Sequence, residues 1–218
     1  MVVLIVLAAL GVGGDRLAAR LVADEAERRL LAEGFSGPTV QMHGFPFLTQ
    51  LAKRTFTRVT VTSEGLEAGD GRASDVRAEL TEVRTPRAGP VRIGSLAATG
   101  TVPYDVVEGA VGSLGLAAGP AGQVEVTRAV EVAGQRFDVV AQARVQASGV
   151  RLRIVPTDLQ VAGVPALTDR LRALIADRVG LVYDIPDLPD GVQVEAVTAT
   201  AAGFEVRATG REVSVDPG

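Results

Sequence analysis

Histidine and cysteine, two residue types often used in acid–base and metal chemistry, are scarce in this chain of 218 residues. Cysteine is absent, and His43 is the single histidine, placed between Met42 and Gly44. A general base or a metal ligand needs partner side chains, and no second histidine or cysteine is present to join His43. We therefore interpret His43 as a structural or surface residue, and we predict no metal site and no thiolate chemistry.

The carboxylates and serines form no catalytic motif either. Three aspartates recur at every third position of residues 184–190, but prolines separate them, and a Ca²⁺ loop requires alternating oxygen ligands. Asp105 and Glu108 are spaced as neighbours on a helix, where most charged pairs are solvated. The segment Gly-Ser-Leu-Gly at residues 112–115 lacks the first glycine of a nucleophile elbow, and no phosphate-binding glycine motif occurs. We predict that the protein is not an enzyme and that it uses no cofactor.

The composition of the chain narrows the classes of function that remain. The formal net charge is −4 with both signs mixed throughout, and no basic stripe is present, so nucleic acid is not an expected partner. Hydrophobic residues make up 47% of the chain and aromatic residues 4%, without any Trp. The chain therefore has enough aliphatic residues to build the core of one large domain or of two small ones.

The N-terminal segment has the character of a targeting sequence. The first 14 residues carry no charge and are mostly Val, Leu, Ile and Ala. This is the length of the apolar region of a signal peptide and is short for a membrane span, although the usual preceding positive residues are missing. We interpret residues 1–14 as an export signal that is retained as a membrane anchor, with a buried core strand as the alternative.

Residues 15–33 have the pattern of an amphipathic helix, with leucine and alanine on one face and charged residues on the other. Two interpretations remain open: a stalk that lifts a domain off the membrane, or a helix packed against a sheet. The predicted organisation is an anchor segment at residues 1–14, a stalk helix at residues 15–34, and one α+β domain at residues 35–218.

An apolar stretch at residues 44–51, Gly-Phe-Pro-Phe-Leu-Thr-Gln-Leu, leads into the rest of the chain. It holds two of the six Phe residues. We expect a short helix over residues 47–53, since the prolines before it break helix and Lys53 and Arg54 suit a helix C-terminus. A strand follows from residue 58. The apolar side chains of this stretch must be covered, either by protein or by a ligand.

The remainder alternates between apolar and polar residues, as strands with one buried face do. Two helices interrupt the alternation, at residues 104–114 and 164–178, and the Gly/Ala-rich segment 115–122 is expected to be a loop. The pattern predicts an α+β fold with a long antiparallel sheet. The expected strands cover residues 76–83, 91–98, 124–132, 137–145 and 150–154, and a last hairpin covers residues 192–206 with its turn at residues 202–203.

The predicted elements carry much apolar surface. A long antiparallel sheet coils, and a coiled sheet around a helix either closes on itself or leaves a groove. A groove of Val, Leu, Ala and Phe suits an acyl chain, since each buried methylene contributes about 0.8 kcal/mol. A dry core is the alternative, and composition does not separate the two.

Two motifs resemble a known family. Residues 44–51, with Arg-Val-Thr-Val-Thr at 58–62 and Gly-Leu at 65–66, resemble the N-terminal motif of the LmeA-like phospholipid-binding family. Residues 185–192, Ile-Pro-Asp-Leu-Pro-Asp-Gly-Val, followed by Gly-Phe-Glu-Val at 203–206, resemble its C-terminal part. The resemblance implies a highly curved antiparallel sheet wrapped around a long helix, as in TULIP-like lipid-binding proteins, and no catalytic motif.

The resemblance also implies a function. Family members are exported, membrane-associated proteins of the bacterial cell envelope that bind phospholipids and phosphoinositides, and the founding member supports mannan elongation of lipomannan. We therefore expect a periplasmic or envelope protein that holds acyl chains in a groove. The alternative is a non-enzymatic accessory of a membrane glycosyltransferase with a dry core.

Residues for such a groove come from the apolar stretch, the two internal helices and one strand. Lys53, Arg54 and Arg58 are candidates to meet a lipid phosphate, with a solvated basic patch as the alternative. The predicted lining residues are Phe45, Phe47, Leu48, Leu51, Val107, Val111, Phe137, Leu171 and Leu174.

Overall fold

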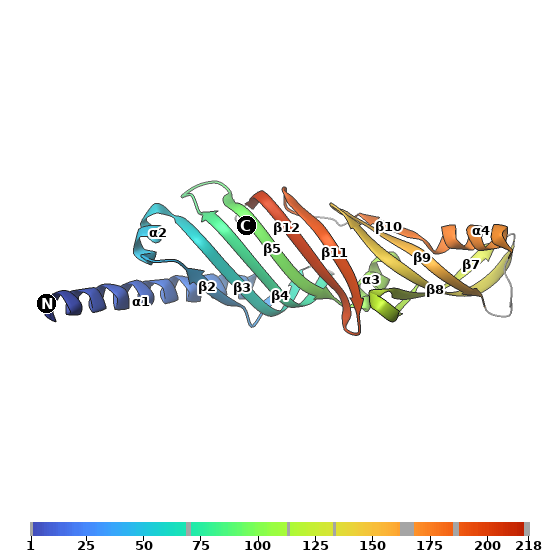
Figure 1. The fold of residues 1–218 in the computed structure, drawn as a ribbon, viewed down its shortest axis with the longest axis horizontal. Helices are drawn as coiled ribbons and strands as arrows, with labels where there is room; N and C mark the ends of the chain where they lie inside the picture. The colour runs from blue at the N-terminus through green and yellow to red at the C-terminus, as the bar shows by residue number, and fades with distance from the viewer. Residues whose placement is uncertain are drawn as a thin grey trace.

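The computed structural model shows an elongated molecule in which two antiparallel sheets lie one after the other along its length (Figure 1). It describes residues 2–68, 71–112, 114–132, 134–161, 168–184 and 188–215. Helix α1 (Val2–Ala32) lies at one end and helix α4 (Asp169–Val179) at the other. The structure confirms the predicted α+β fold of large antiparallel sheets with a long helix, and it distributes the strands over two sheets.

The first sheet arches over α1 (Figure 1) and has the order β1-β3-β4-β5-β12-β11, with β2 paired to β3. The β3–β4 pair is a long hairpin whose register runs from Thr55↔Arg84 to Ala68↔Gly71. The chain returns to this sheet near its end, because β12 pairs with β5. The strands are β1 (Phe35–Ser36), β2 (Thr39–His43), β3 (Thr55–Ala68), β4 (Gly71–Arg84), β5 (Val91–Val102), β11 (Val192–Thr200) and β12 (Gly203–Val215).

The second sheet has the order β10-β9-β8-β7-β6, and α4 packs on it. Its buried face alternates as the sequence predicts, with Val124, Val126 and Val130 inward on β7. Ile175 and Val179 of α4 complete this core. The strands are β6 (Gly115–Ala118), β7 (Val124–Val132), β8 (Gln135–Ser148), β9 (Arg151–Val161) and β10 (Leu181–Asp184).

Helix α1 supplies the core of the first sheet. The face of α1 that carries Ala19, Ala23 and Ala26 packs against strand residues such as Val40 and Val59. Small side chains let the helix backbone approach the sheet closely, so the C-terminal part of α1 belongs to the packed domain. The helix runs without a break across the predicted boundary between residues 14 and 15. Within the described residues, no helix combines the length and the hydropathy that spanning a membrane requires.

Some element boundaries differ from expectation. The prediction of a loop at residues 115–122 is wrong, because Gly115–Ala118 form strand β6 and Pro120–Gly122 form a 3₁₀ turn. Cross-strand pairing with β7, from Gly115↔Thr127 to Ala118↔Val124, offsets the weak strand propensity of Gly and Ala. The first internal helix, α3 (Tyr104–Val111), ends at Gly112, which has a positive φ. Of the helix predicted for residues 164–178, residues 164–167 lie outside the described part of the chain.

The short helix α2 (Phe47–Lys53) has the bounds that the sequence predicts. Its N-cap residue is Pro46, which has no side-chain acceptor for the first backbone N–H groups. Asp15 of α1, which is distant in the sequence, supplies this acceptor. Its Oδ1 accepts the Leu48 N–H at 2.8 Å, and the residue is only 3% exposed. On the buried face of α2, the ring of Phe47 stacks on the ring of Phe56 of β3, with ring centroids 6.0 Å apart. Helix α2 is thus held from two sides.

Replacing Asp15 by alanine is expected to lower the free energy of unfolding by about 2 kcal/mol, since a buried hydrogen bond to a charged group is lost and an N–H is left unpaired. Urea denaturation of the two proteins measures this difference. Asp24→Ala is the matched control, because Asp24 is exposed on the same helix, and we expect a change within about 0.5 kcal/mol. Equal losses for both variants would show that Asp15 does not hold α2.

Candidate functional site

An apolar cavity of about 290 Å³ lies where the two sheets meet. Strands from both sheets and one face of α3 form its walls. Every described residue that lines it is aliphatic or Phe, so the cavity presents hydrocarbon on all of its described sides. These residues are Val102, Val106, Val107, Ala110, Val145, Leu152, Ile154, Leu188, Val194, Val197, Phe204, Val206 and Ala208.

The cavity follows from how the sheets are joined. Strand β11 of the first sheet meets the second sheet through a single described backbone bridge, in which the Val194 N–H donates to the Gly149 carbonyl oxygen at 2.8 Å. A continuous ladder would hold the two sheets about one strand spacing apart along their whole edge. No described ladder joins the two sheets beyond this bridge, and apolar side chains from both sheets surround the space between them.

Helix α3 closes one side of this space, and two side chains attach it. The Tyr104 hydroxyl donates to the Thr200 carbonyl oxygen at 2.7 Å, and its ring meets Phe204 edge-on at 4.9 Å. Glu108 accepts the Leu116 N–H of β6. Burial raises the pKa of Tyr104, so the phenol stays neutral and keeps this hydrogen bond well above neutral pH. The helix is therefore tied to both sheets.

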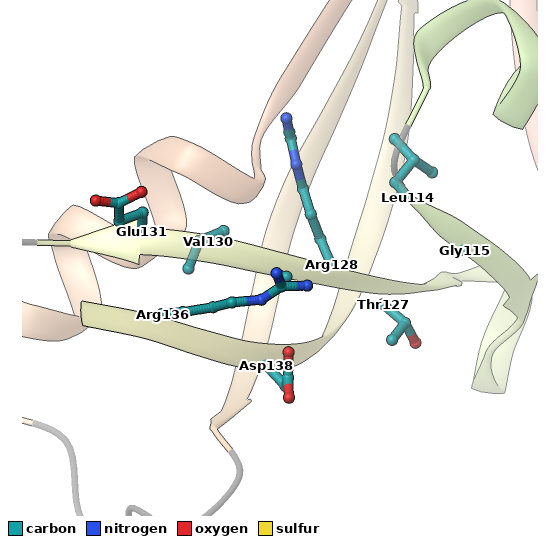
Figure 2. Close-up of a pocket in the computed structure, with 9 residues that line it drawn as sticks. Leu114, Gly115, Thr127, Arg128, Val130, Glu131, Arg136 and Asp138 are labelled. Carbon is teal, nitrogen blue, oxygen red and sulfur yellow. The ribbon is translucent and has the colours of Figure 1, made fainter. Parts of the chain in front are cut away.

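A larger hollow of about 700 Å³ lies over the outer part of β7 and β8, but it opens broadly to solvent. Figure 2 shows Arg136 and Asp138 on β8 and Thr127 on β7 among its lining residues. An open depression with charges of both signs does not remove a hydrocarbon chain from water. For an apolar ligand, the smaller cavity between the sheets is the better site despite its size.

A third hollow, of about 710 Å³, lies between α1, α2 and the loop that connects β4 to β5. Its apolar lining includes Met42, Leu51 and Phe56, and arginine side chains, among them Arg54 and Arg87, also line it. This groove differs from the inter-sheet cavity, since it combines apolar walls with charged side chains.

The structure does not bring the predicted lining residues together in one groove. Val107 lines the inter-sheet cavity, and Val111 follows one turn later on α3, half-buried. Phe137 is half-buried against the core of the second sheet, and Leu174 of α4 is half exposed. The side chain of Leu171 lies outside the described part of the structure.

The predicted residues around α2 have different environments. Phe47 is 2% exposed and belongs to the core of the first sheet, whereas Phe45 and Leu48 project outward. Leu51 is 37% exposed and lines the groove beside α2. Among the predicted headgroup residues, Arg54 lines the groove beside α2, Lys53 is exposed, and Arg58 pairs with Glu79 at 3.2 Å.

Most cavity residues were missed by the sequence analysis. Val194, Val197, Phe204 and Val206 belong to the last hairpin, which the sequence predicts as strands, but nothing local places that hairpin beside α3. The one available signal is the aliphatic side chains of the hairpin, which mark a buried face without saying what covers it.

Comparison with known proteins gives one match. Residues 13–209 match the protein family described as LmeA-like phospholipid-binding. This range contains every described residue that lines the inter-sheet cavity. No curated protein and no solved structure matches the chain.

Proposed function

The chain belongs to the LmeA-like phospholipid-binding family, and from this premise we propose that it holds phospholipid acyl chains in the cavity between its two sheets. The observation that carries the proposal is the lining of this cavity, which contains no polar side chain among the described residues. A phospholipid presents two chemistries, and only its hydrocarbon part matches such a lining. The headgroup then lies outside the cavity.

The volume sets how much of a lipid enters. About 290 Å³ is at the lower end of the range for small-ligand pockets. This volume accommodates a stretch of acyl chain rather than a whole diacyl lipid. Burying about eight methylenes contributes about 6 kcal/mol before the cost of association, without any directional contact.

We further propose a cellular location and a biological role for the protein. We place the protein in the bacterial cell envelope, exported and attached to the membrane by residues 1–14, because this segment carries no charge. The role is non-enzymatic. A phosphoinositide ligand, support of lipomannan elongation and contact with an envelope glycosyltransferase are further parts of this proposal, which the family resemblance suggests.

Native mass spectrometry of the purified full chain, with extraction of its lipids, tests the central claim. We expect phospholipid to be released on denaturation, and lipid-stripped protein to take up phospholipid from liposomes. Liposomes of phosphatidylinositol and of phosphatidylcholine compare the headgroups. Protein that carries no lipid and takes up none would overturn the proposal and favour the accessory role with a dry core.

A further inference from the structure

Three large hydrophobic side chains are exposed around α2. Phe45 is 62% exposed, Leu48 is 50% exposed and Leu51 is 37% exposed, within seven consecutive positions. Exposed hydrophobic residues scattered over a surface are ordinary, but a cluster on one short element marks a contact surface. We call Phe45, Leu48, Leu51, Lys53 and Arg54 the α2 tip. None of these five residues lines the inter-sheet cavity.

The α2 tip is held rigidly in this exposed arrangement. Phe47 is buried beneath it, and Asp15 fixes the Leu48 N–H from α1. Gln50 bonds to both flanking segments, since its Nε2 donates to the His43 carbonyl oxygen at 3.3 Å and its Oε1 accepts the Thr57 N–H at 2.8 Å. A loosely held loop would fold its apolar side chains inward, and these contacts prevent that.

The chain segment that carries the α2 tip has charged side chains of one sign. Residues 34–63 contain no Asp or Glu, whereas Lys53, Arg54 and Arg58 lie in this range, in a chain whose net charge is −4. Arg58 is neutralised by Glu79 on the neighbouring strand. Within the part of the chain that the structure describes, neither Lys53 nor Arg54 forms an ion pair.

Two carboxylates lie beside α2, and each already has a hydrogen-bond partner. Asp15 is buried under α2 with its Oδ1 on the Leu48 N–H. Glu25 lines the groove beside Arg54, but it bonds to Arg28 and Arg29, which lower its pKa and keep it paired. The cations at the end of α2 therefore remain available to an anionic partner.

From these observations we propose that the α2 tip is a membrane-contact surface. It inserts Phe45, Leu48 and Leu51 into the interface of an anionic bilayer, while Lys53 and Arg54 bind lipid phosphates. Amphipathic elements with this pairing of exposed apolar and basic residues bind the boundary between headgroups and acyl chains. This contact is independent of lipid uptake into the inter-sheet cavity.

The position of the α2 tip supports a bilayer over a protein partner. Figure 1 shows α2 at the same end of the molecule as the N-terminal part of α1, which extends beyond the first sheet. Residues 1–14 of that helix carry no charge. Two apolar features thus lie at one end, and together they orient the long axis of the molecule away from the membrane.

A tryptophan reporter tests the proposal, because the chain contains no Trp. Leu48→Trp is measured in the full chain with vesicles of phosphatidylcholine and phosphatidylglycerol, with and without lipids brominated on the acyl chains. We expect a blue shift of the emission and quenching by the brominated lipids. Leu174→Trp is the matched control, since Leu174 is also a helical leucine that is 50% exposed, on α4 at the far end. Its emission is expected to stay unchanged.

The cations have a separate readout. In the Leu48→Trp protein, adding Lys53→Ala and Arg54→Ala is expected to raise the vesicle concentration for half-maximal blue shift by about fivefold per cation removed. A blue shift without this dependence would overturn the assignment to anionic lipid. If vesicles leave the Leu48→Trp emission unchanged, or change it no more than that of the Leu174→Trp control, the α2 tip does not contact the membrane. This is also the result expected if a partner protein covers α2.

Discussion

Replacing Val107 by aspartate is expected to reduce phospholipid binding by about 100-fold or more. Val107 faces the inter-sheet cavity from α3. A carboxylate at this position is solvated while the cavity is empty, and an entering acyl chain removes that water. Desolvation of an unpaired charge costs several kcal/mol, and every 1.4 kcal/mol corresponds to a tenfold change in affinity. Lipid counted by native mass spectrometry after liposome incubation measures the effect.

Two further variants make this result specific. Val140→Asp introduces the same change on the outer face of β8, where Val140 is 36% exposed and lines no described hollow, and we expect it to keep its lipid. Ala110→Trp fills the cavity from α3 without adding charge, and we expect it to lose lipid as well. If Val107→Asp and Ala110→Trp both fold and both retain lipid, the acyl chain does not occupy this cavity.

Replacing Phe47 by alanine is expected to lower the free energy of unfolding by about 3–5 kcal/mol. Phe47 is among the largest fully buried side chains of the described chain, and it lies between α1 and the first sheet. Its removal leaves a cavity and also ends the ring contact with Phe56. For a domain of this size the midpoint of thermal unfolding should fall by roughly 6–20 °C.

Leu48→Ala is the matched control, since Leu48 is the next residue on α2 and is half exposed. We expect its free energy of unfolding to change by less than about 0.5–1 kcal/mol. Thermal unfolding followed by circular dichroism compares both variants with the parent protein. Equal stability of the two variants would contradict the assignment of Phe47 to the core.

Much of the local architecture was predictable from the sequence, because its causes are local. Pro46 before an apolar run and Lys53 at its end determine the bounds of α2. Alternation of apolar with polar residues predicts β7 and most of β8, since successive side chains of a strand point to opposite faces. The same local signals failed at β6, where pairing with β7 decides the structure of a Gly/Ala-rich segment.

The candidate site was only partly predictable. The sequence predicted that the helix α3 lines an apolar groove, and Val107 of α3 does line the inter-sheet cavity. The opposite wall comes from Val197 and Phe204, which lie about ninety residues further along the chain. Periodicity shows that such side chains are buried, but it contains no information on which distant element faces them. The inter-sheet position therefore required the pairing of β12 with β5.

The sequence by itself determined that this protein is an aliphatic α+β chain with motifs of the LmeA-like phospholipid-binding family, to which it belongs. Only the tertiary structure decided what each apolar residue does. Phe47 and Leu48 are neighbours of similar hydrophobicity, yet one is buried and the other projects into solvent. The physical reason is that burial depends on what packs against a helix face, and α1 and the first sheet cover just one face of α2.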